Sequence, residues 1–207
     1  MYECFASAPS GADAVIDFSH PSCFEDVTGY CKKTGTPLVL ATTGLSDEQR
    51  ASFDKLSEDF ALFFSANMSL GVNLIASLVK KAAAILEESF DIEIIEKHHN
   101  QKIDAPSGTA LMLADEIRDS LSSSPKYVYD RHSMRQKRTK NEIGIHAVRG
   151  GTIVGEHDVI FAGNDEIIEI SHKAMSKEIF AVGAIKAATF VAGKKNGMYS
   201  MKNVMEF

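Results

Sequence analysis

Two histidines and a lysine leave a predicted strand just before a predicted helix, in the segment EIIEKHHNQKIDAPSGTA at residues 93–110. Ser107, Gly108 and Thr109 would begin that helix, so their backbone N–H groups and the positive helix end suit a carboxylate. Gly108 has no side chain, which lets an anion approach closely. Lys102 adds a cation that can donate a proton, and a histidine suits acid–base work near neutral pH. The segment is typical of a site that protonates a small anionic substrate.

The histidine pair, His98 and His99, also has a structural interpretation. Adjacent residues of a strand point to opposite faces, so at most one of the two faces a given site. A metal site is disfavoured, because helical zinc-binding histidines are spaced by four residues. The helix start would also serve as an ordinary cap. The combination of histidines, lysine and helix start within a dozen residues favours the functional interpretation.

The remaining histidines follow a strand end, lie in a basic stretch, or lie in or beside predicted strands: His20, His132, His146, His157 and His172. Packing or surface positions explain them. Neither Ser107 nor any cysteine has a neighbouring acid–base group that indicates a nucleophile.

Short apolar runs separated by segments of helical periodicity precede this site. The runs cover residues 14–18, 37–42 and 61–66, and they predict parallel strands with crossover helices. Ser46 and Gln49 form a capping box that predicts a helix through Leu56. Half of a doubly wound sheet is therefore expected.

The pattern changes after Asn67. Ser69 is predicted to cap a long helix, a strand follows at 91–98, and Pro106 with Ser107 opens another helix. Three further strand-like runs predict a mixed sheet, and a last helix should end at Gly193; the runs cover 143–148, 158–161 and 167–172. The fold class is α/β: an incomplete Rossmann-like parallel-sheet domain (1–68 and 178–207) and an α+β domain with a mixed sheet (69–177).

Composition limits the possible classes of function. The 207 residues are 44% hydrophobic and 24% charged with net charge -6, which argues against disorder, membrane residence and a nucleic-acid scaffold. The basic run at residues 131–140 is interpreted as a solvated loop, with a nucleic-acid patch as the disfavoured alternative. Cys4, Cys23 and Cys31 indicate neither disulfides nor zinc. A cytoplasmic protein is expected.

The segment with HH, a lysine three residues later and DAPSGTA resembles the signature of the dihydrodipicolinate reductase family. Further blocks resemble the family in family order: VIDFSHP, ATTGL, SANMSLGVN, IGIHAVRGGTIVGEHDVIFAG, and the tail with GMYSM. The resemblance covers nearly the whole chain. It implies reduction of a cyclic dicarboxylate imine by NADH or NADPH in lysine and diaminopimelate biosynthesis, by a homotetramer assembled through the second domain.

The resemblance also implies roles for individual residues. His98 would be the acid–base residue and Lys102 the second proton donor, while His99, Gly108 and Thr109 would bind substrate carboxylates. Two loops would contact the cofactor, since both follow parallel strands at their carboxyl ends: Ala41, Thr42 and Thr43, and Ser65, Ala66, Asn67 and Met68. Family members usually have glycine where Ala41 stands. No metal is implied.

The beginning of the chain departs from the family pattern, which starts with a strand and a glycine-rich phosphate loop. A βαβ unit needs about 30 residues, and no glycine-rich candidate precedes Val15. We expect a fragment or misplaced start of a complete enzyme. The alternative is a truncated subunit that binds dicarboxylate and oligomerises without turnover.

Overall fold

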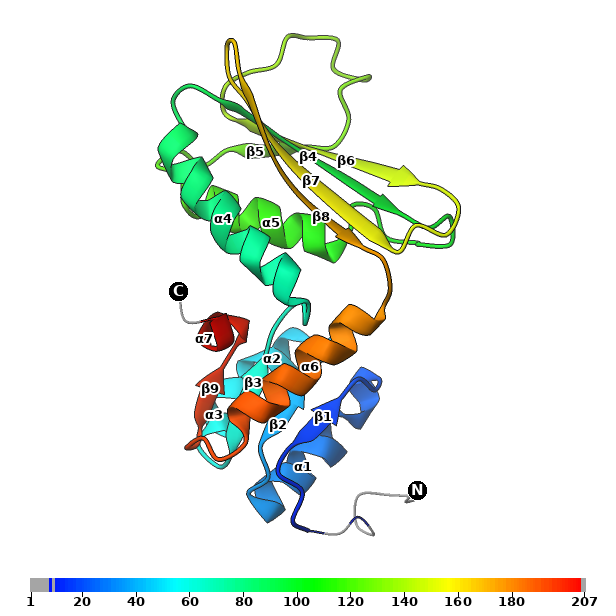
Figure 1. The fold of residues 1–207 in the computed structure, drawn as a ribbon, viewed down its shortest axis with the longest axis vertical. Coiled ribbons are helices and arrows are strands. Elements are labelled where there is room, and N and C mark those ends of the chain that lie inside the picture. The colour runs from blue at the N-terminus through cyan, green and yellow to red at the C-terminus, as the bar shows by residue number, and fades with distance from the viewer. Residues whose placement is uncertain (1–7, 9, 206–207) are drawn as a thin grey trace. The chain divides into compact units, whose positions relative to one another are not determined.

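The computed structural model describes residue 8 and residues 10–205. Cys4, considered above, lies outside them. The chain divides into two compact units, Met1–Leu70 with Glu178–Phe207, and Gly71–Lys177. Figure 1 shows the elements of each unit.

The first unit contains a parallel sheet in the order β1-β2-β3-β9. Its strands are short: β1 (Val15–Asp17), β2 (Leu38–Leu40), β3 (Ala61–Phe64) and β9 (Gly197–Tyr199). The three strands expected from the apolar runs are confirmed, each shorter than its run. No pattern in the sequence predicts β9, which has three residues and pairs with β3.

Apolar side chains cover both faces of this sheet. One layer packs under α1 (Phe24–Thr34) and α3 (Phe53–Ser57), and the other packs under α6 (Glu178–Val191) and α7 (Met201–Met205). The 3-10 helix η2 (Pro21–Cys23) precedes α1, and α2 (Asp47–Ala51) precedes α3 and has no buried residue. The capping box of Ser46 and Gln49 is confirmed. The helix it opens is interrupted at Ser52, so the single predicted helix is two short ones.

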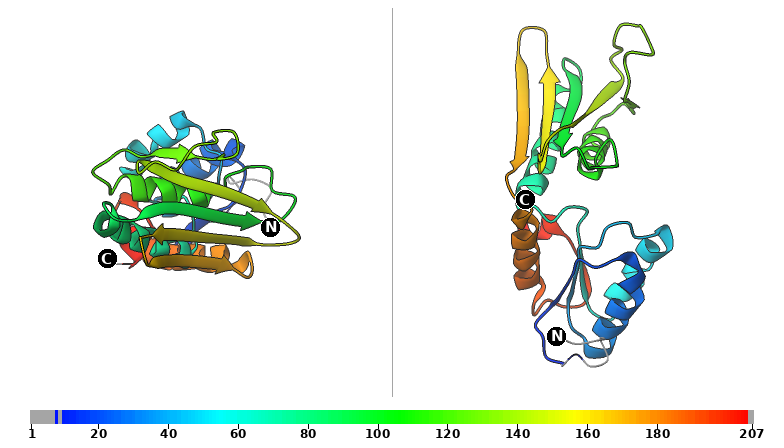
Figure 2. Two further views of the ribbon diagram at one scale, coloured as in Figure 1. Left: turned by 90° about the horizontal axis from the view of Figure 1, so that it is seen from above. Right: turned by 90° about the vertical axis from the view of Figure 1, so that its right-hand side faces the viewer.

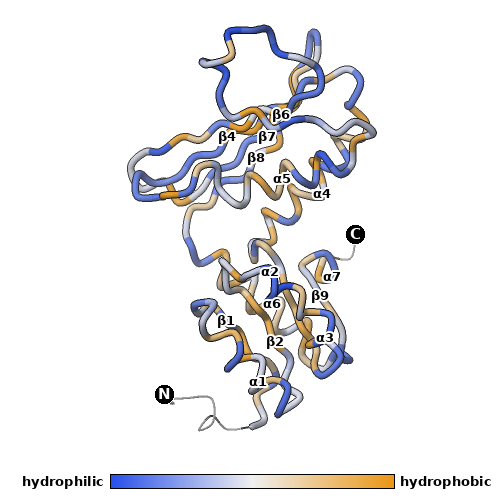
Figure 3. The backbone as a smooth tube through the Cα atoms, turned by 180° about the vertical axis from the view of Figure 1, so that it is seen from behind, coloured by the Kyte–Doolittle hydropathy of each residue, from blue (hydrophilic) through white to orange (hydrophobic). Residues whose placement is uncertain are grey.

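The second unit contains the predicted mixed sheet, and its strands lie in the order β5-β6-β4-β7-β8, of which β5 was not predicted. The strands are β4 (Asp91–His98), β5 (Lys126–Val128), β6 (Glu142–Arg149), β7 (Gly155–Ala162) and β8 (Ile167–Ala174). Two helices, α4 (Leu70–Leu86) and α5 (Gly108–Arg118), pack on one face (Figure 2). Hydrophobic and hydrophilic residues alternate along its strands (Figure 3), as expected of a sheet with one covered face.

The basic run at residues 131–140 is not simply a solvated loop, so that interpretation is wrong in part. Arg131 donates to Glu142, at 2.9 Å, and to Glu93. Arg138 donates to Asp91 at 2.8 Å and to Glu93 at 3.0 Å. These contacts draw the loop onto strands β4 and β6, because their carboxylates offset its positive charge. A like-charge run is therefore held by partners that are distant in sequence.

Candidate active site

Strand β4 brings the chemistry of the 93–110 segment to the covered face of the sheet. Its side chains are alternately half-buried and buried, and Ile92, Ile94, Glu96 and His98 are the buried set. A strand has a side-chain period of two, so Glu96 and His98 lie on one face with the apolar core residues that precede them. His98, the last residue of the strand, is 9% exposed, and Glu96 is fully buried.

Glu96 is the centre of a hydrogen-bond network. Its Oε2 lies 2.6 Å from Nδ1 of His98, and the Arg149 guanidinium donates to both carboxylate oxygens at 2.8 Å. The backbone N–H of Ser107 donates to Oε1 at 3.0 Å. Burial favours the neutral acid, but the hydrogen bonds from Arg149, His98 and Ser107 outweigh it and lower the pKa of Glu96. The carboxylate is therefore ionised near neutral pH.

Arg149 reaches this network from the neighbouring strand. It is the last residue of β6, and its Cα pairs with that of His98 in the parallel register. Its Nη2 also donates to the carbonyl of Asp104 at 2.6 Å. The bidentate contact between a guanidinium and a carboxylate is strong and fixes the orientation of both groups.

His157 of strand β7 completes the surroundings of His98. The two rings meet edge to face, with centroids 5.3 Å apart. Burial, followed by the nearby His98, lowers the pKa of His157 to about 4, so this ring is neutral near pH 7. Its Nε2 lies 3.0 Å from Oγ of Ser107, while its buried Nδ1 has no hydrogen-bond partner within the described part of the chain.

Helix α5 begins beside this cluster, as predicted. Ser107 is its N-cap, and the hydroxyl oxygen accepts from the N–H of Ala110 at 3.2 Å. Gly108 and Thr109 are the first two helical residues; Gly108 is exposed, and a Cβ there would meet no heavy atom within 4 Å. An exposed helix start with a glycine at its first position suits the carboxylate predicted for it.

Lys102 lies in the turn between β4 and α5. Its Nζ lies 2.8 Å from Oδ1 of Asp104, and its backbone N–H donates to the carbonyl of His99. The hydrogen bond from Lys102 lowers the pKa of Asp104. The ammonium is therefore held by an exposed carboxylate, on the segment that also carries Gly108 and Thr109.

The sequence assigns no role to Glu96 or Arg149, and it explains His157 by packing or a surface position. His157 is indeed buried, but it also contacts His98, and its Nδ1 has no partner among the described residues. Glu96 had a usable signal: it stands two residues before His98 in a strand. Arg149 had none, because only the register of β6 against β4 brings it there.

The loops predicted to contact a cofactor lie in the first unit. Ala41, Thr42 and Thr43 follow β2, and Ser65, Ala66, Asn67 and Met68 follow β3. The side chain of Asp17, at the end of β1, accepts from Thr42 Oγ1 at 2.7 Å and from the N–H of Ser19 at 3.0 Å. The backbone N–H of Ala41 donates to the Asp17 carbonyl at 2.8 Å. Asp17 thus fixes the loop after β2, and the Thr42 hydroxyl is one of the groups through which it does so.

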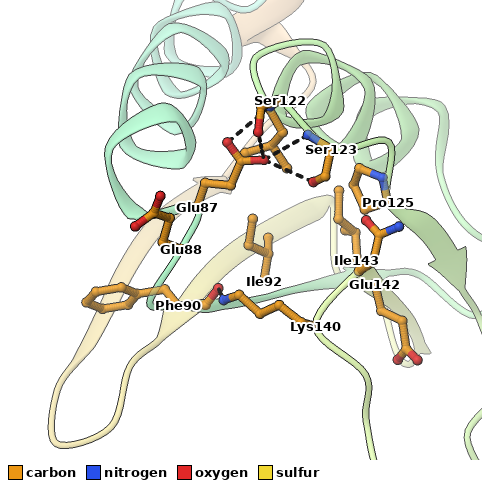
Figure 4. A pocket seen from close by; sticks show the side chains of 12 residues that line it. Glu87, Glu88, Phe90, Ile92, Ser122, Ser123, Pro125, Lys140, Glu142 and Ile143 are labelled. Carbon is orange, nitrogen blue, oxygen red and sulfur yellow. Dashed lines mark hydrogen bonds between the residues drawn. The ribbon is translucent and has the colours of Figure 1, made fainter.

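A pocket of about 310 Å³ lies elsewhere in the second unit (Figure 4). Its lining comes from the end of α4, the segment before β5 and the start of β6. Figure 4 shows the Glu87 carboxylate bonded to Ser122 and Ser123, which lowers the pKa of Glu87 to about 2. None of the predicted site residues lines this pocket. The Glu87 carboxylate already accepts the hydrogen bonds that hold the loop at Ser122 and Ser123.

The described residues contain neither a metal cluster nor a membrane-spanning helix. No group of three or more histidine, cysteine, aspartate or glutamate side chains there is placed to hold a metal ion. No helix in the same residues combines the length and apolarity needed to cross a membrane.

Comparison with known proteins identifies a matching family over both parts of the chain. The model of the dihydrodipicolinate reductase N-terminus matches residues 1–68, and that of the C-terminus matches residues 71–205. The 4-hydroxy-tetrahydrodipicolinate reductase of Clostridium tetani is 54% identical over 97% of this chain and 78% of its own length. That of Clostridium novyi is 51% identical over 100% of this chain and 81% of its own length.

A solved structure shows the same fold. The dipicolinate-bound dihydrodipicolinate reductase from Paenisporosarcina sp. TG-14 superimposes with a TM-score of 0.75 at 27% identity, over 92% of this chain and 73% of its own. That relative is bound to dipicolinate, a ring dicarboxylate.

Proposed function

The chain belongs to the dihydrodipicolinate reductase family, and we propose that it reduces 4-hydroxy-tetrahydrodipicolinate to tetrahydrodipicolinate with NADH or NADPH, in lysine and diaminopimelate biosynthesis. One observation carries the proposal at the level of atoms. A histidine held by a buried carboxylate stands beside the exposed start of a helix, so a proton donor and an anion site occur together.

We assign the residues of the second unit as follows. His98 is the acid–base residue, because Nδ1 is bonded to Glu96 and the proton exchanged with substrate would be carried on Nε2. Lys102 is the second proton donor, while His99, Gly108 and Thr109 bind the carboxylates of a small heterocycle. The substrate class is supported by the dipicolinate on the related structure, since dipicolinate is a planar ring dicarboxylate.

The first unit is assigned to the nicotinamide cofactor, which supplies the hydride when bound. The fit rests on the sheet: β1, β2 and β3 are parallel, so their carboxyl ends meet at one edge, where such sheets bind ligands. The loop residues 41–43 and 65–68 follow two of these ends. Thr43 and Ala66 are exposed there, and Asp17 holds the first loop in place. The domain limits proposed are 1–68 with 178–207 for cofactor, and 69–177 for substrate.

A homotetramer formed through the second unit is also proposed. Helices α4 and α5 pack on one face of its sheet (Figure 2), while the strands carry exposed apolar side chains, with Val148 at 45% and Ile167 at 66%. Exposed apolar groups on a sheet favour association with a second copy. Sedimentation of the purified chain would measure the assembly, and a monomer at micromolar concentration would contradict it. The biosynthetic family supports a cytoplasmic location.

The experiment that tests the function measures binding and turnover separately. NADH and NADPH are titrated into the chain by fluorescence, with and without pyridine-2,6-dicarboxylate, and the steady-state reduction rate is then followed. We expect nucleotide binding, dicarboxylate binding and turnover. The affinities for NADH and NADPH, compared with each other, give the cofactor preference of the chain. Dicarboxylate binding without nucleotide binding or turnover would contradict the proposed reaction.

Two variants test the residue roles within this experiment. His98→Gln and Lys102→Ala should each lower turnover by about 100-fold or more, the usual contribution of a general acid or base. Nucleotide affinity should be nearly unchanged, because both residues belong to the second unit. Lys80→Ala, which removes a surface ion pair with Glu116, is the matched control and should keep full turnover. Full turnover in either test variant would remove that residue from its role.

A further inference from the structure

Glu96 is a fully buried carboxylate. Removing a carboxylate from water costs free energy, which an ion pair and hydrogen bonds must offset. Each of its oxygens has two partners: Oε1 takes Ser107 N–H and Arg149 Nη2, and Oε2 takes Arg149 Nη1 and His98 Nδ1. Those partners come from three places in the chain, namely the end of β4, the end of β6 and the cap of α5. One side chain therefore joins the histidine to the helix start.

We propose that Glu96 is the positioning residue of the active site: it holds His98 with its proton on Nδ1 and Nε2 directed to substrate, and holds the start of α5 at the same time. The proposal rests on the proposed function for the identity of the substrate. It adds a residue that orients the proton donor and the anion site together.

The tautomer follows from hydrogen-bond chemistry. An ionised carboxylate only accepts hydrogen bonds, so the 2.6 Å contact requires a proton on Nδ1 of His98. The neutral imidazole then presents an unprotonated Nε2, and the imidazolium presents an Nε2–H that can be donated. Arg149 keeps Glu96 ionised through two charge-assisted bonds. Glu96 therefore determines which ring nitrogen exchanges the proton.

The surroundings of the other ring nitrogen agree with this assignment. A Cβ at Gly155 would lie 3.0 Å from Nε2 of His98, so the absence of a side chain there leaves room beside that nitrogen. The charged and titratable groups at the ring are Glu96 on β4, Arg149 on β6 and His157 on β7. His157 is neutral near pH 7 and adds no positive charge beside His98.

The start of α5 is held by Oε1 of Glu96, which also accepts a hydrogen bond from Arg149. Ser107 donates its backbone N–H to Oε1 and uses its hydroxyl to cap Ala110 N–H, so its main chain is fixed from two sides. Gly108 and Thr109 follow directly. A displacement of Glu96 would therefore move the carboxylate-binding groups and the imidazole together, which is what positioning a two-point substrate requires.

Glu96→Gln separates the two tasks. The amide oxygen is expected at the Oε1 position, where both partners are donors. The NH2 group then faces Nδ1 of His98 and loses the hydrogen bond from Arg149 Nη1. An NH2 donor requires an acceptor, so the neutral ring should move its proton to Nε2. The anion site keeps its Ser107 contact. The variant should therefore lose turnover by about 100-fold or more while it still binds pyridine-2,6-dicarboxylate.

The test measures the ring protons of His98 directly. The chain is labelled with ¹⁵N-histidine, His98→Gln assigns the resonance, and long-range ¹H–¹⁵N correlation spectra at a pH where the ring is neutral distinguish the tautomers. We expect the Nδ1–H form in the wild-type chain and the Nε2–H form in Glu96→Gln. Glu93→Gln is the matched control, because Glu93 is on the same strand and also contacts arginines and a histidine; it should keep the wild-type tautomer and turnover.

If the neutral ring of His98 in the wild-type chain carries its proton on Nε2, the proposal is overturned. This measurement needs only the wild-type chain, so it holds even if Glu96→Gln fails to fold. A variant that keeps the wild-type tautomer, or switches tautomer with full turnover, overturns it as well. The spectra need no catalysis, so a chain that shows the Nδ1–H form but reduces no substrate would contradict the proposed function and leave the positioning of His98 supported.

Discussion

Strand β4 contributes to two clusters that contain the same kinds of residue but have different roles. Toward the start of the strand, Glu93 contacts Arg131, Arg138 and His146; at its end, Glu96 contacts Arg149 and His98. Both are a carboxylate with arginine and histidine. Their neighbours differ: the first ties a loop to the sheet, and the second lies beside the start of α5.

Exposure and available space separate the clusters further. The His146 side chain is 38% exposed and that of His98 is 11% exposed. At Gly144, a Cβ would overlap Oε2 of Glu93, so the first cluster fills the space that the glycine leaves. At Gly155, a Cβ would lie 3.0 Å from Nε2 of His98. Residue type alone therefore does not distinguish the two clusters; the second differs because its histidine is held at one nitrogen and has a glycine beside the other.

Loss of the arginine should show the largest difference in stability between the clusters. Arg149→Met leaves a fully buried carboxylate without its guanidinium, and the free energy of unfolding should fall by about 3 kcal/mol. Arg138→Met should cost about 1 kcal/mol, because the Glu93 side chain is 20% exposed and keeps Arg131 and His146. Urea unfolding monitored by circular dichroism measures both.

Equal losses of unfolding free energy in Arg149→Met and Arg138→Met would mean that burial does not distinguish the two clusters. Turnover of the folded Arg149→Met protein should also fall, whereas Arg138→Met should retain it, since Arg138 lies at the other cluster.

Local sequence patterns predicted most of the second unit. The period of two along β4, the cap at Ser107 and the apolar stripe of α5 are each contained in one short stretch, so the strand and helix that frame the site were predictable. The resemblance to a family supplied roles for His98 and Lys102. The burial of Glu96 could not be predicted in the same way, because a charged residue in a strand usually faces solvent.

Strand register supplied what the sequence lacks. Arg149 reaches His98 because β4 and β6 are parallel, and His157 pairs with Glu96 because β4 and β7 are antiparallel. These residues are separated from Glu96 by 53 and 61 positions respectively in the numbering of the chain. The folding of the basic loop onto Asp91 and Glu93 has the same cause. Short elements such as β9 carry too few residues for a periodic signal.

A pH titration of stability should detect the buried histidine of the second cluster. His157 has a pKa of about 4 when folded against 6.5 as its ordinary value, so the unfolded chain binds the proton more readily. Stability is therefore complete above pH 6.5 and is lost as the pH falls toward 4. The two values correspond to about 3 kcal/mol for this residue.

His157→Gln should make the unfolding free energy less dependent on pH across that window, as measured by urea unfolding at several pH values between 4 and 7. His132→Gln is the control, since His132 is exposed in the basic loop; its profile should follow the wild type. An identical slope in His157→Gln and the wild type would show that His157 is protonated equally easily in both states.

The two glycines provide the finest test of the comparison. Gly144→Ala adds a methyl group where Glu93 already lies, and overpacking there should lower the unfolding free energy by about 1 to 3 kcal/mol with turnover retained. Gly155→Ala places its methyl group 3.0 Å from Nε2 of His98, so the ring that Glu96 holds must shift by a small distance. Stability should fall by about 1 kcal/mol, and turnover should fall by about tenfold because the methyl group partly covers Nε2. Steady-state rates and urea unfolding of the two variants separate these effects. Full turnover in Gly155→Ala would show that substrate does not approach Nε2 of His98 from the side of Gly155.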